Sequence, residues 1–265
     1  MITSLQNPLI KQMRKLHRPK GRREQNLFLI EGTHLLETAC SVNSSLDVVC
    51  CTPQWQTNHK QLWEKAQSLA QRTEVVTPEV LAAIATTINP DGVVASATRI
   101  FEDSLAKSPL SLGLMLERLQ DPGNLGTIIR TAVATEVDQL WLTHDSVDLD
   151  NPKVLRASAG EWFRVPMRVS DNLGALIEGY KRQQVQVIGT LPQGNKTYWE
   201  IDFTRPTLIL LGNEGAGLTP ELVSLVDQQV TIPLGGGVES LNVAIAAALL
   251  LYEAKRQKQL TIDNG

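Results

Sequence analysis

The chain has 265 residues, 42% of them hydrophobic and 20% charged, which is typical of a soluble globular protein with one large or two ordinary domains. Its longest apolar run, residues 241–252, is too short to cross a bilayer, and residues 1–10 lack the apolar core of a signal peptide. We therefore expect a cytoplasmic protein with no membrane partner. Neither the three cysteines nor the four scattered histidines have metal-ligand spacing, so no metal is expected.

The net charge of −3 hides a basic cluster at the start of the chain. The first 25 residues carry seven basic side chains and only one acidic one, Glu24. Such a cluster favours contacts with the phosphate backbone of a nucleic acid. A solvated helix face followed by a mobile basic loop explains the cluster equally well. The basic residues are Lys11, Arg14, Lys15, Arg18, Lys20, Arg22 and Arg23.

The first part of the chain alternates short helical and strand-like segments, which predicts a small α/β domain in residues 1–98. Residues 99–109 contain a proline, serines and charges and are interpreted as a linker. Helices are expected at residues 8–16, 33–39, 59–71 and 78–85. Strands are expected at residues 26–30, 46–51, 75–76 and 92–96.

The second part alternates more regularly and is predicted to form one domain, residues 110–260. Its order of elements predicts a mostly parallel sheet covered by helices on both faces. Strands are expected at residues 110–119, 139–143, 164–169, 185–190, 207–212 and 230–233. Helices are expected at residues 125–135, 151–159, 173–183, 220–226 and 241–257.

Three loops in this second domain each follow a predicted strand and lead into a predicted helix. In open α/β sheets ligands bind outside the carboxyl ends of the strands, so three such loops predict a small-molecule site. The loops are Gln-Asp-Pro-Gly-Asn-Leu-Gly at residues 120–126, Gly-Asn-Glu-Gly-Ala-Gly at 212–217 and Gly-Gly-Gly-Val-Glu-Ser-Leu-Asn at 235–242.

Each loop also has a simpler interpretation. In the first, Asn124 stands where a helix N-cap would stand, and Arg130 can be a surface base. The glycine spacing of the second matches neither the dinucleotide fingerprint nor a P-loop. The third leads into a helix that is apolar all round, which predicts a buried helix start where Ser240 caps and the Asn242 amide needs partners.

Taken in this order, the three loops resemble the motifs of the SpoU (TrmH-type) family of RNA ribose 2′-O-methyltransferases in the SPOUT superfamily. The resemblance covers residues 110–257, and the segment 151–160 resembles the stretch between the first two motifs. The N-terminal part is similar to the family's substrate-binding domain, an α/β module akin to an RNA-binding ribosomal protein. The matching runs are Asp121-Pro-Gly-Asn124-Leu-Gly126-Thr-Ile-Ile-Arg130, Leu211-Gly-Asn-Glu214-Gly-Ala-Gly217 and Ile232-Pro233-Leu-Gly-Gly-Gly-Val-Glu-Ser240-Leu-Asn242.

The resemblance implies a deep trefoil knot, a homodimer, and the cofactor S-adenosylmethionine bound in the knot. It implies catalytic roles for Arg130, Asn124, Glu214, Ser240 and Asn242. The expected RNA-binding residues are Lys11, Arg14, Lys15, Arg18, Arg22, Arg23 and Arg156. The expected cofactor-binding residues are Thr190, Leu191, Pro192, Leu211, Gly212, Asn213, Glu214, Gly215, Ile232, Pro233, Leu234, Ser240, Leu241 and Asn242.

The family analogy assigns Arg130 to activation of the ribose hydroxyl. A guanidinium stays protonated in proteins, so we expect Arg130 to bind the substrate phosphate and to stabilise developing oxyanion charge instead. The sizeable N-terminal domain favours ribosomal RNA as the substrate. A transfer-RNA methyltransferase, a resistance methylase that protects its host from an antibiotic, and a non-catalytic RNA-binding module that keeps the cofactor pocket remain as alternatives.

Overall fold

The computed structural model of the protein describes residues 1–98 and 109–263, and these residues form two compact units. The first unit contains the N-terminal residues together with Asp148–Phe163, and the second contains the rest. The sequence placed residues 148–163 in the C-terminal domain, whereas in the structure they pack with the N-terminal residues. Except for residue 109, the predicted linker lies outside the described residues.

The first unit is built on a four-stranded sheet in the order β1-β4-β2-β3. Strands β2 and β3 are parallel, and β4 runs antiparallel to both of its neighbours. The strands are β1 (Leu27–Glu31), β2 (Leu46–Cys51), β3 (Ala70–Val75) and β4 (Val93–Thr98). The helices are α1 (Pro8–Lys15), α2 (Pro19–Gln25), α3 (Thr33–Ser41), α4 (Pro53–Asn58), α5 (Lys60–Leu69), α6 (Pro78–Ile84) and α8 (Pro152–Ala157), followed by the 3-10 helix η2 (Glu161–Phe163).

Alternating side chains send this sheet's apolar residues into two cores. Cys51 joins the core that holds α3 and α5, whereas the neighbouring Cys50 joins the core that holds α1 and α6. Trp162 packs on Phe28 with ring centroids 4.8 Å apart, which ties the segment 148–163 into the first core. This aromatic contact explains why that segment belongs to the first unit.

The second unit is built on a seven-stranded sheet in the order β7-β6-β5-β10-β8-β11-β9, and its pairings in the described residues are all parallel. The strands are β5 (Leu112–Leu116), β6 (Gln139–Thr143), β7 (Met167–Ser170), β8 (Gln186–Thr190), β9 (Lys196–Thr197), β10 (Thr207–Leu211) and β11 (Gln228–Thr231). The helices are α7 (Pro122–Ala134), α9 (Leu173–Arg182), α10 (Pro220–Leu225) and α11 (Val243–Asp263), with the 3-10 helix η3 (Tyr198–Glu200).

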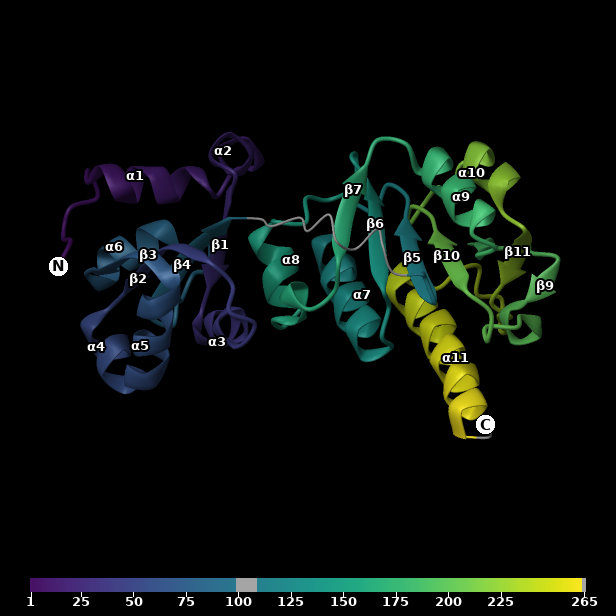
Figure 1. Ribbon diagram of the computed structural model, residues 1–265. Helices are drawn as coiled ribbons and strands as arrows, with labels where there is room; N and C mark the ends of the chain where they lie inside the picture. The colour runs from purple at the N-terminus through teal and green to yellow at the C-terminus, as the bar shows by residue number, and fades with distance from the viewer. Residues whose placement is uncertain (99–108, 264–265) are drawn as a thin grey trace. The chain divides into compact units, whose positions relative to one another are not determined.

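Helices cover both faces of this sheet, as the sequence predicted. Every residue of β5 and β10 is buried, which requires cover on both sides. Helices α9 and α10 share one core with Met115 and Leu210, while α7 and α11 pack together on the other face (Figure 1). The chain is therefore an α/β protein whose neighbouring parallel strands β5, β10, β8 and β11 end at one edge of the sheet.

Several predicted elements differ from the observed ones. The basic run after α1 is not a loop: it contains helix α2, which begins with Pro19, a favoured first helical residue. The helix expected at 59–71 is α5, and the helix before it, α4, was not predicted. Strand β3 begins at Ala70, inside that predicted helix, because its exposed, polar residues give no apolar alternation. None of the helices in the described residues is long and apolar enough to span a membrane.

Candidate active site

The carboxylate of Glu214 joins the first two glycine-bearing loops. It accepts hydrogen bonds from the backbone N–H groups of Gln120 and Asp121, at 3.3 and 3.2 Å, and from the side-chain amide of Asn124, at 3.2 Å. These donors lie on the loop that follows β5 and on the first turn of α7, whereas Glu214 follows β10. The strands are neighbours in the sheet, so their loops meet at its carboxyl edge.

Asn124 extends this connection to the third loop. Its Oδ1 accepts a hydrogen bond of 2.9 Å from Nδ2 of Asn242, whose own Oδ1 accepts one from the backbone N–H of Ala244. The three loops therefore converge. Asn124 is not the helix cap that the sequence suggested: α7 begins one turn earlier, and Asp121 is the cap, accepting from the Asn124 N–H at 2.8 Å. Its side chain is thus available to link the other two loops.

Glu214 is held as a carboxylate. Partial burial acts to raise its pKa, but hydrogen bonds from its own backbone N–H, the Asn124 amide and the N–H groups of Asp121 and Gln120 outweigh burial and lower the pKa. Because its lone pairs are occupied and its basicity is reduced, this carboxylate is poorly suited to take a proton from a substrate. Its geometry fits the role of a clasp between loops.

An open pocket lies beside this clasp, at the carboxyl ends of β8, β10 and β11. Of the described residues that line it, Glu214 and Glu239 are acidic and none is basic. The hydroxyl of Thr190 at its edge is buried without a hydrogen-bond partner among the described residues. The lining residues are Thr190, Leu191, Pro192, Leu211, Gly212, Asn213, Glu214, Gly215, Gly217, Thr231, Ile232, Leu234, Glu239, Ser240, Leu241, Val243 and Ala246.

This lining contains most of the predicted cofactor-binding residues, although their role stays a prediction. Pro233 and Asn242 are the two members of the predicted set outside it. Sequence reasoning missed five lining residues. Gly217 and Glu239 lie inside the quoted loops and could have been included. Val243 and Ala246 could not have been identified, because they reach the pocket only through the observed start of α11 at Val243.

The start of α11 is more exposed than the sequence indicated. The helix begins at Val243, and Ser240, Leu241 and Asn242 before it are exposed. Asn242, rather than Ser240, stands next to the first helical residue. The helix is also not buried all round, because Ile245 and Tyr252 are 51% and 55% exposed. The apolar sequence of α11 therefore gave no indication that one face of the helix is exposed.

Arg130 does not line the pocket of its own chain. It is exposed on α7, six residues after Asn124, which places it about 9 Å along the axis and about 120° around it. The expectation of a guanidinium beside the pocket is therefore not met within one chain.

The predicted RNA-binding residues divide into exposed and structural ones. Arg22 is only 3% exposed; its guanidinium lies 2.6 Å from Asp148 and donates to the carbonyl oxygens of Leu16 and His17. These partners hold the guanidinium inside the first unit, and this burial argues against the predicted contact with RNA. Arg156 is partly exposed but paired with Glu31 at 3.2 Å. Those exposed on α1, on α2 or between these helices are Lys11, Arg14, Lys15, Arg18 and Arg23.

Two sequence profiles cover most of the chain. The profile of the SpoU rRNA Methylase family matches residues 111–252, more than half of the chain. This protein belongs to the SpoU rRNA methylase family. The profile of the MRM3-like substrate binding domain matches residues 7–95, in the first unit.

Individual relatives of this SpoU family member match over nearly their whole length. An uncharacterized tRNA/rRNA methyltransferase of Synechocystis sp. is 49% identical over 97% of this chain and 94% of the relative. The 23S rRNA (guanosine(2553)-2′-O)-methyltransferase RlmP of Bacillus subtilis is 34% identical over 96% of this chain and 98% of its own. The crystal structure of an AdoMet-bound rRNA methyltransferase from Sinorhizobium meliloti has a TM-score of 0.84 and 32% identity, covering 96% of this chain and 97% of that one.

Proposed function

We propose that this protein is an enzyme that transfers the methyl group of S-adenosylmethionine to the 2′-oxygen of a ribose in RNA, and that this RNA is ribosomal. Its relatives support the reaction class, and the RlmP match extends through the N-terminal domain. The reaction forms an O–CH3 bond, breaks the C–S bond of the sulfonium, and releases S-adenosylhomocysteine and the hydroxyl proton. We place it in the cytoplasm, where such RNA is modified.

The observation that carries this proposal is the charge of the pocket. S-adenosylmethionine supplies an activated methyl group on a positively charged sulfonium and also carries an ammonium group. Glu214 and Glu239 are complementary to these cations, and the absence of basic side chains from the described lining disfavours nucleotide phosphates. The unpartnered Thr190 hydroxyl and the apolar residues Leu191, Ile232 and Leu241 suit the polar edge and flat faces of an adenosine.

Calorimetry with the full chain tests this assignment of the pocket. We expect S-adenosylmethionine and S-adenosylhomocysteine to bind, and adenosine triphosphate at the same concentration to give no heat. Preferential binding of the triphosphate would contradict the assignment, because its phosphates would have to enter an acidic pocket.

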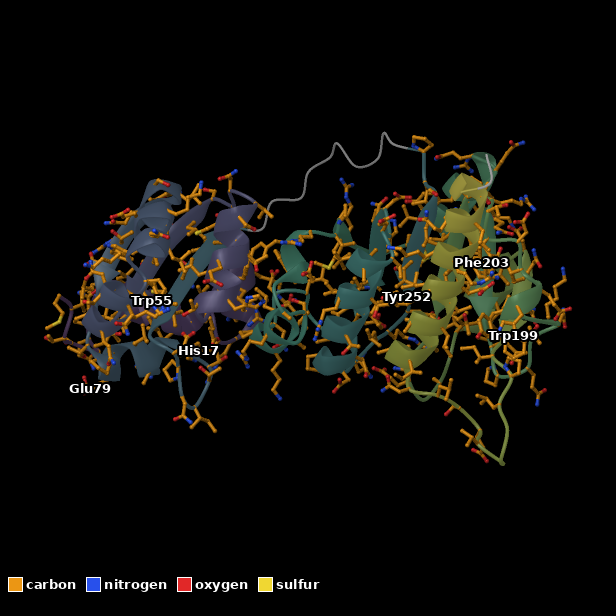
Figure 2. All side chains as sticks on the ribbon, turned by 90° about the horizontal axis from the view of Figure 1, so that it is seen from below. His17, Trp55, Glu79, Trp199, Phe203 and Tyr252 are labelled. Carbon is orange, nitrogen blue, oxygen red and sulfur yellow. The ribbon has the colours of Figure 1, made fainter. Side chains whose placement is uncertain are left out.

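Helix α11 supports a homodimer. Ile245 and Tyr252 lie with Tyr198, Ala248 and Leu249 around a hollow on its uncovered face. The neighbouring Trp199 is 60% exposed (Figure 2). Exposed apolar side chains that border such a hollow, here Ile245 and Tyr252, are typical of an interface. We propose that a second copy covers this face.

A dimer also offers a place for Arg130. Helix α7, which carries it, packs against α11, the helix that bears the proposed interface. Since Arg130 does not line the pocket of its own chain, we propose that it serves the pocket of the second copy. There its guanidinium would bind the RNA phosphate and stabilise charge on the attacking oxygen.

We further propose the deep trefoil knot that the family resemblance implied. Strand β10 lies between β5 and β8 although it follows both in the chain, and the loops after β10 and β11 line one pocket. These two features support a crossing of the chain near the cofactor loops. Tracing the backbone in a crystal structure checks the crossing.

A further inference from the structure

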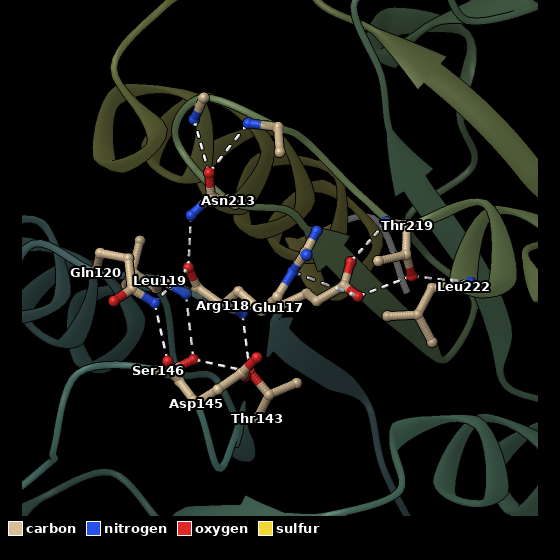
Figure 3. A network of polar contacts seen from close by, with 12 residues as sticks. Glu117, Arg118, Leu119, Gln120, Thr143, Asp145, Ser146, Asn213, Thr219 and Leu222 are labelled. Carbon is tan, nitrogen blue, oxygen red and sulfur yellow. Dashed lines mark hydrogen bonds and ion pairs between the residues drawn. The ribbon is translucent and has the colours of Figure 1, made fainter.

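Glu117 is a buried carboxylate just after the end of β5, outside the pocket lining. The residue is 6% exposed, and its carboxylate accepts two hydrogen bonds of 2.7 Å, from the backbone N–H and from the hydroxyl of Thr219 (Figure 3). Thr219 is the residue that caps α10, and it lies 102 residues further along the chain. A carboxylate buried this deeply is costly unless such donors satisfy it. The contact therefore fixes the place of Thr219 against β5.

Thr219 follows the glycine-rich loop of residues 212–217. The residue after Glu117, Arg118, contacts the beginning of that loop. Its carbonyl oxygen accepts a hydrogen bond of 2.8 Å from the side-chain amide of Asn213. Its backbone has a φ of 52°, in the left-handed region that non-glycine residues rarely adopt. Such a conformation persists only where its surroundings impose it, and here the Arg118 N–H is bonded to the Thr143 hydroxyl at 2.8 Å.

Between these two anchors the loop is closed on itself. The backbone groups of Asn213 and Gly217 exchange hydrogen bonds of 3.1 and 2.9 Å, and the Asn213 side chain also accepts from the N–H groups of Gly215 and Ala216. A glycine-rich segment loses more conformational entropy on ordering than any other. Two anchors on consecutive residues of the β5 end therefore order the loop before a ligand arrives, which lowers the entropy lost on binding.

We propose that Glu117 is a positioning residue for the methyl-donor pocket: through Thr219 it holds residues 212–217 in the conformation that binds the cofactor. This inference rests on the proposed function of the pocket. The Glu117 side chain lies outside the pocket lining and acts on residues 212–217 through Thr219, so its effect is on cofactor affinity and not on RNA affinity.

Full-length variants and S-adenosylhomocysteine as the probe test this role by calorimetry. Glu117→Met removes both acceptors at similar volume and is expected to weaken binding at least about tenfold, which is about 1.4 kcal/mol. Glu117→Gln keeps one acceptor for the Thr219 N–H and is expected to bind within about threefold of the wild type. Thr219→Val is expected to follow Glu117→Met in direction, and Thr219→Ser to restore wild-type binding.

Affinity for RNA is measured on the same proteins and is expected to stay unchanged, which a general loss of structure would not allow. If Glu117→Met does not fold, the Thr219→Val and Thr219→Ser pair carries the test. Wild-type affinity in folded Glu117→Met, or in Thr219→Val, overturns the role of Glu117 and leaves the proposed function standing. A wild-type protein that does not bind the probe overturns the proposed function and this inference together.

Discussion

The side-chain amide of Asn124 donates a 3.2 Å hydrogen bond to the carboxylate of Glu214, which lies 90 residues further along the chain. The other side of the same amide group accepts from Asn242 at 2.9 Å. The side chain of Asn124 is therefore hydrogen-bonded to both of the other loops. Because a single amide has both a donor and an acceptor, no aspartate or leucine of similar size could make both contacts.

Acid should weaken the clasp at Glu214. Its folded-state pKa is lowered, so its contribution to stability is present above the ordinary glutamate pKa and is lost as the pH falls through the lowered value. We expect Glu214→Gln to cost about 1 kcal/mol at neutral pH, a value kept small by the exposure of the site. Urea unfolding of both proteins checks this, and the difference should shrink in acid. A difference that grows in acid contradicts the assigned hydrogen bonds.

Glu239 should distinguish the two forms of the cofactor. S-adenosylmethionine has a sulfonium charge that S-adenosylhomocysteine lacks, and Glu239 is an exposed carboxylate on the pocket wall. Glu239→Gln is expected to raise the Kd of S-adenosylmethionine by about threefold to tenfold, in line with about 1 kcal/mol for an exposed charge pair. The Kd of S-adenosylhomocysteine serves as the matched control and should change less. Equal effects on both ligands would remove the electrostatic role of Glu239.

Arg130 should matter for transfer and not for cofactor binding. Arg130→Ala is expected to lower kcat at least about a hundredfold, the usual cost of removing a group that stabilises charge in a transition state. Its Kd for S-adenosylhomocysteine should stay unchanged, because Arg130 lies outside the pocket lining. Parallel loss of both quantities would indicate damage to the fold.

Mixed dimers test which copy Arg130 serves. Arg130→Ala is combined with a second variant whose pocket is blocked, Gly215→Trp, and the two are refolded together. If Arg130 acts on the other copy, mixed dimers regain part of the activity that each variant lacks. Activity no higher than the sum of the separate variants contradicts action between copies.

The exposed bases of α1 should set the salt dependence of RNA binding. Lys11→Gln is expected to weaken RNA binding and to reduce the slope of log K against log salt by about 0.7 to 0.9, the value for one phosphate contact. Lys60→Gln, an exposed lysine on α5 of the same unit, is the matched control and should leave the slope unchanged. Identical slopes for the wild type and both variants would return α1 to the role of a solvated helix face.

The apolar face of α11 should control oligomeric state. Tyr252→Glu places a charge among Ile245 and Leu249 and is expected to convert a dimer into a monomer in light scattering. Arg182→Glu, an exposed change on α9, is the control and should leave the mass unchanged. A wild-type protein that is monomeric at micromolar concentration contradicts the proposed dimer.

Local patterns predicted most of the fold, and long-range pairing accounts for what they missed. Strands β2 and β6 have the bounds expected from their buried apolar runs. A short apolar run bounded by polar residues leaves little choice of where the strand begins and ends. Burial of Arg22 could not be foreseen, since its partner Asp148 is 126 residues away. The position of Asn124 was misjudged because Pro122 starts α7 earlier than the apolar pattern begins.

The candidate site was more predictable than these details. Its loops follow neighbouring parallel strands, and that topology alone brings Glu214 and Asn124 to one edge of the sheet. Glycines and acidic residues of the second and third loops line the pocket as a consequence of this topology. Arg130 is the exception, because a motif gives its distance along the chain but not the direction in which a helix turns it.

The most direct test of the central claim is mass-spectrometric mapping of ribose methylation after the purified protein is incubated with methyl-labelled S-adenosylmethionine and ribosomal RNA that lacks the modification. We predict that the label enters one RNA position as a 2′-O-methyl group, that Arg130→Ala abolishes it, and that transfer RNA is not labelled. Label on a base, or none on RNA while the cofactor binds, would contradict the account.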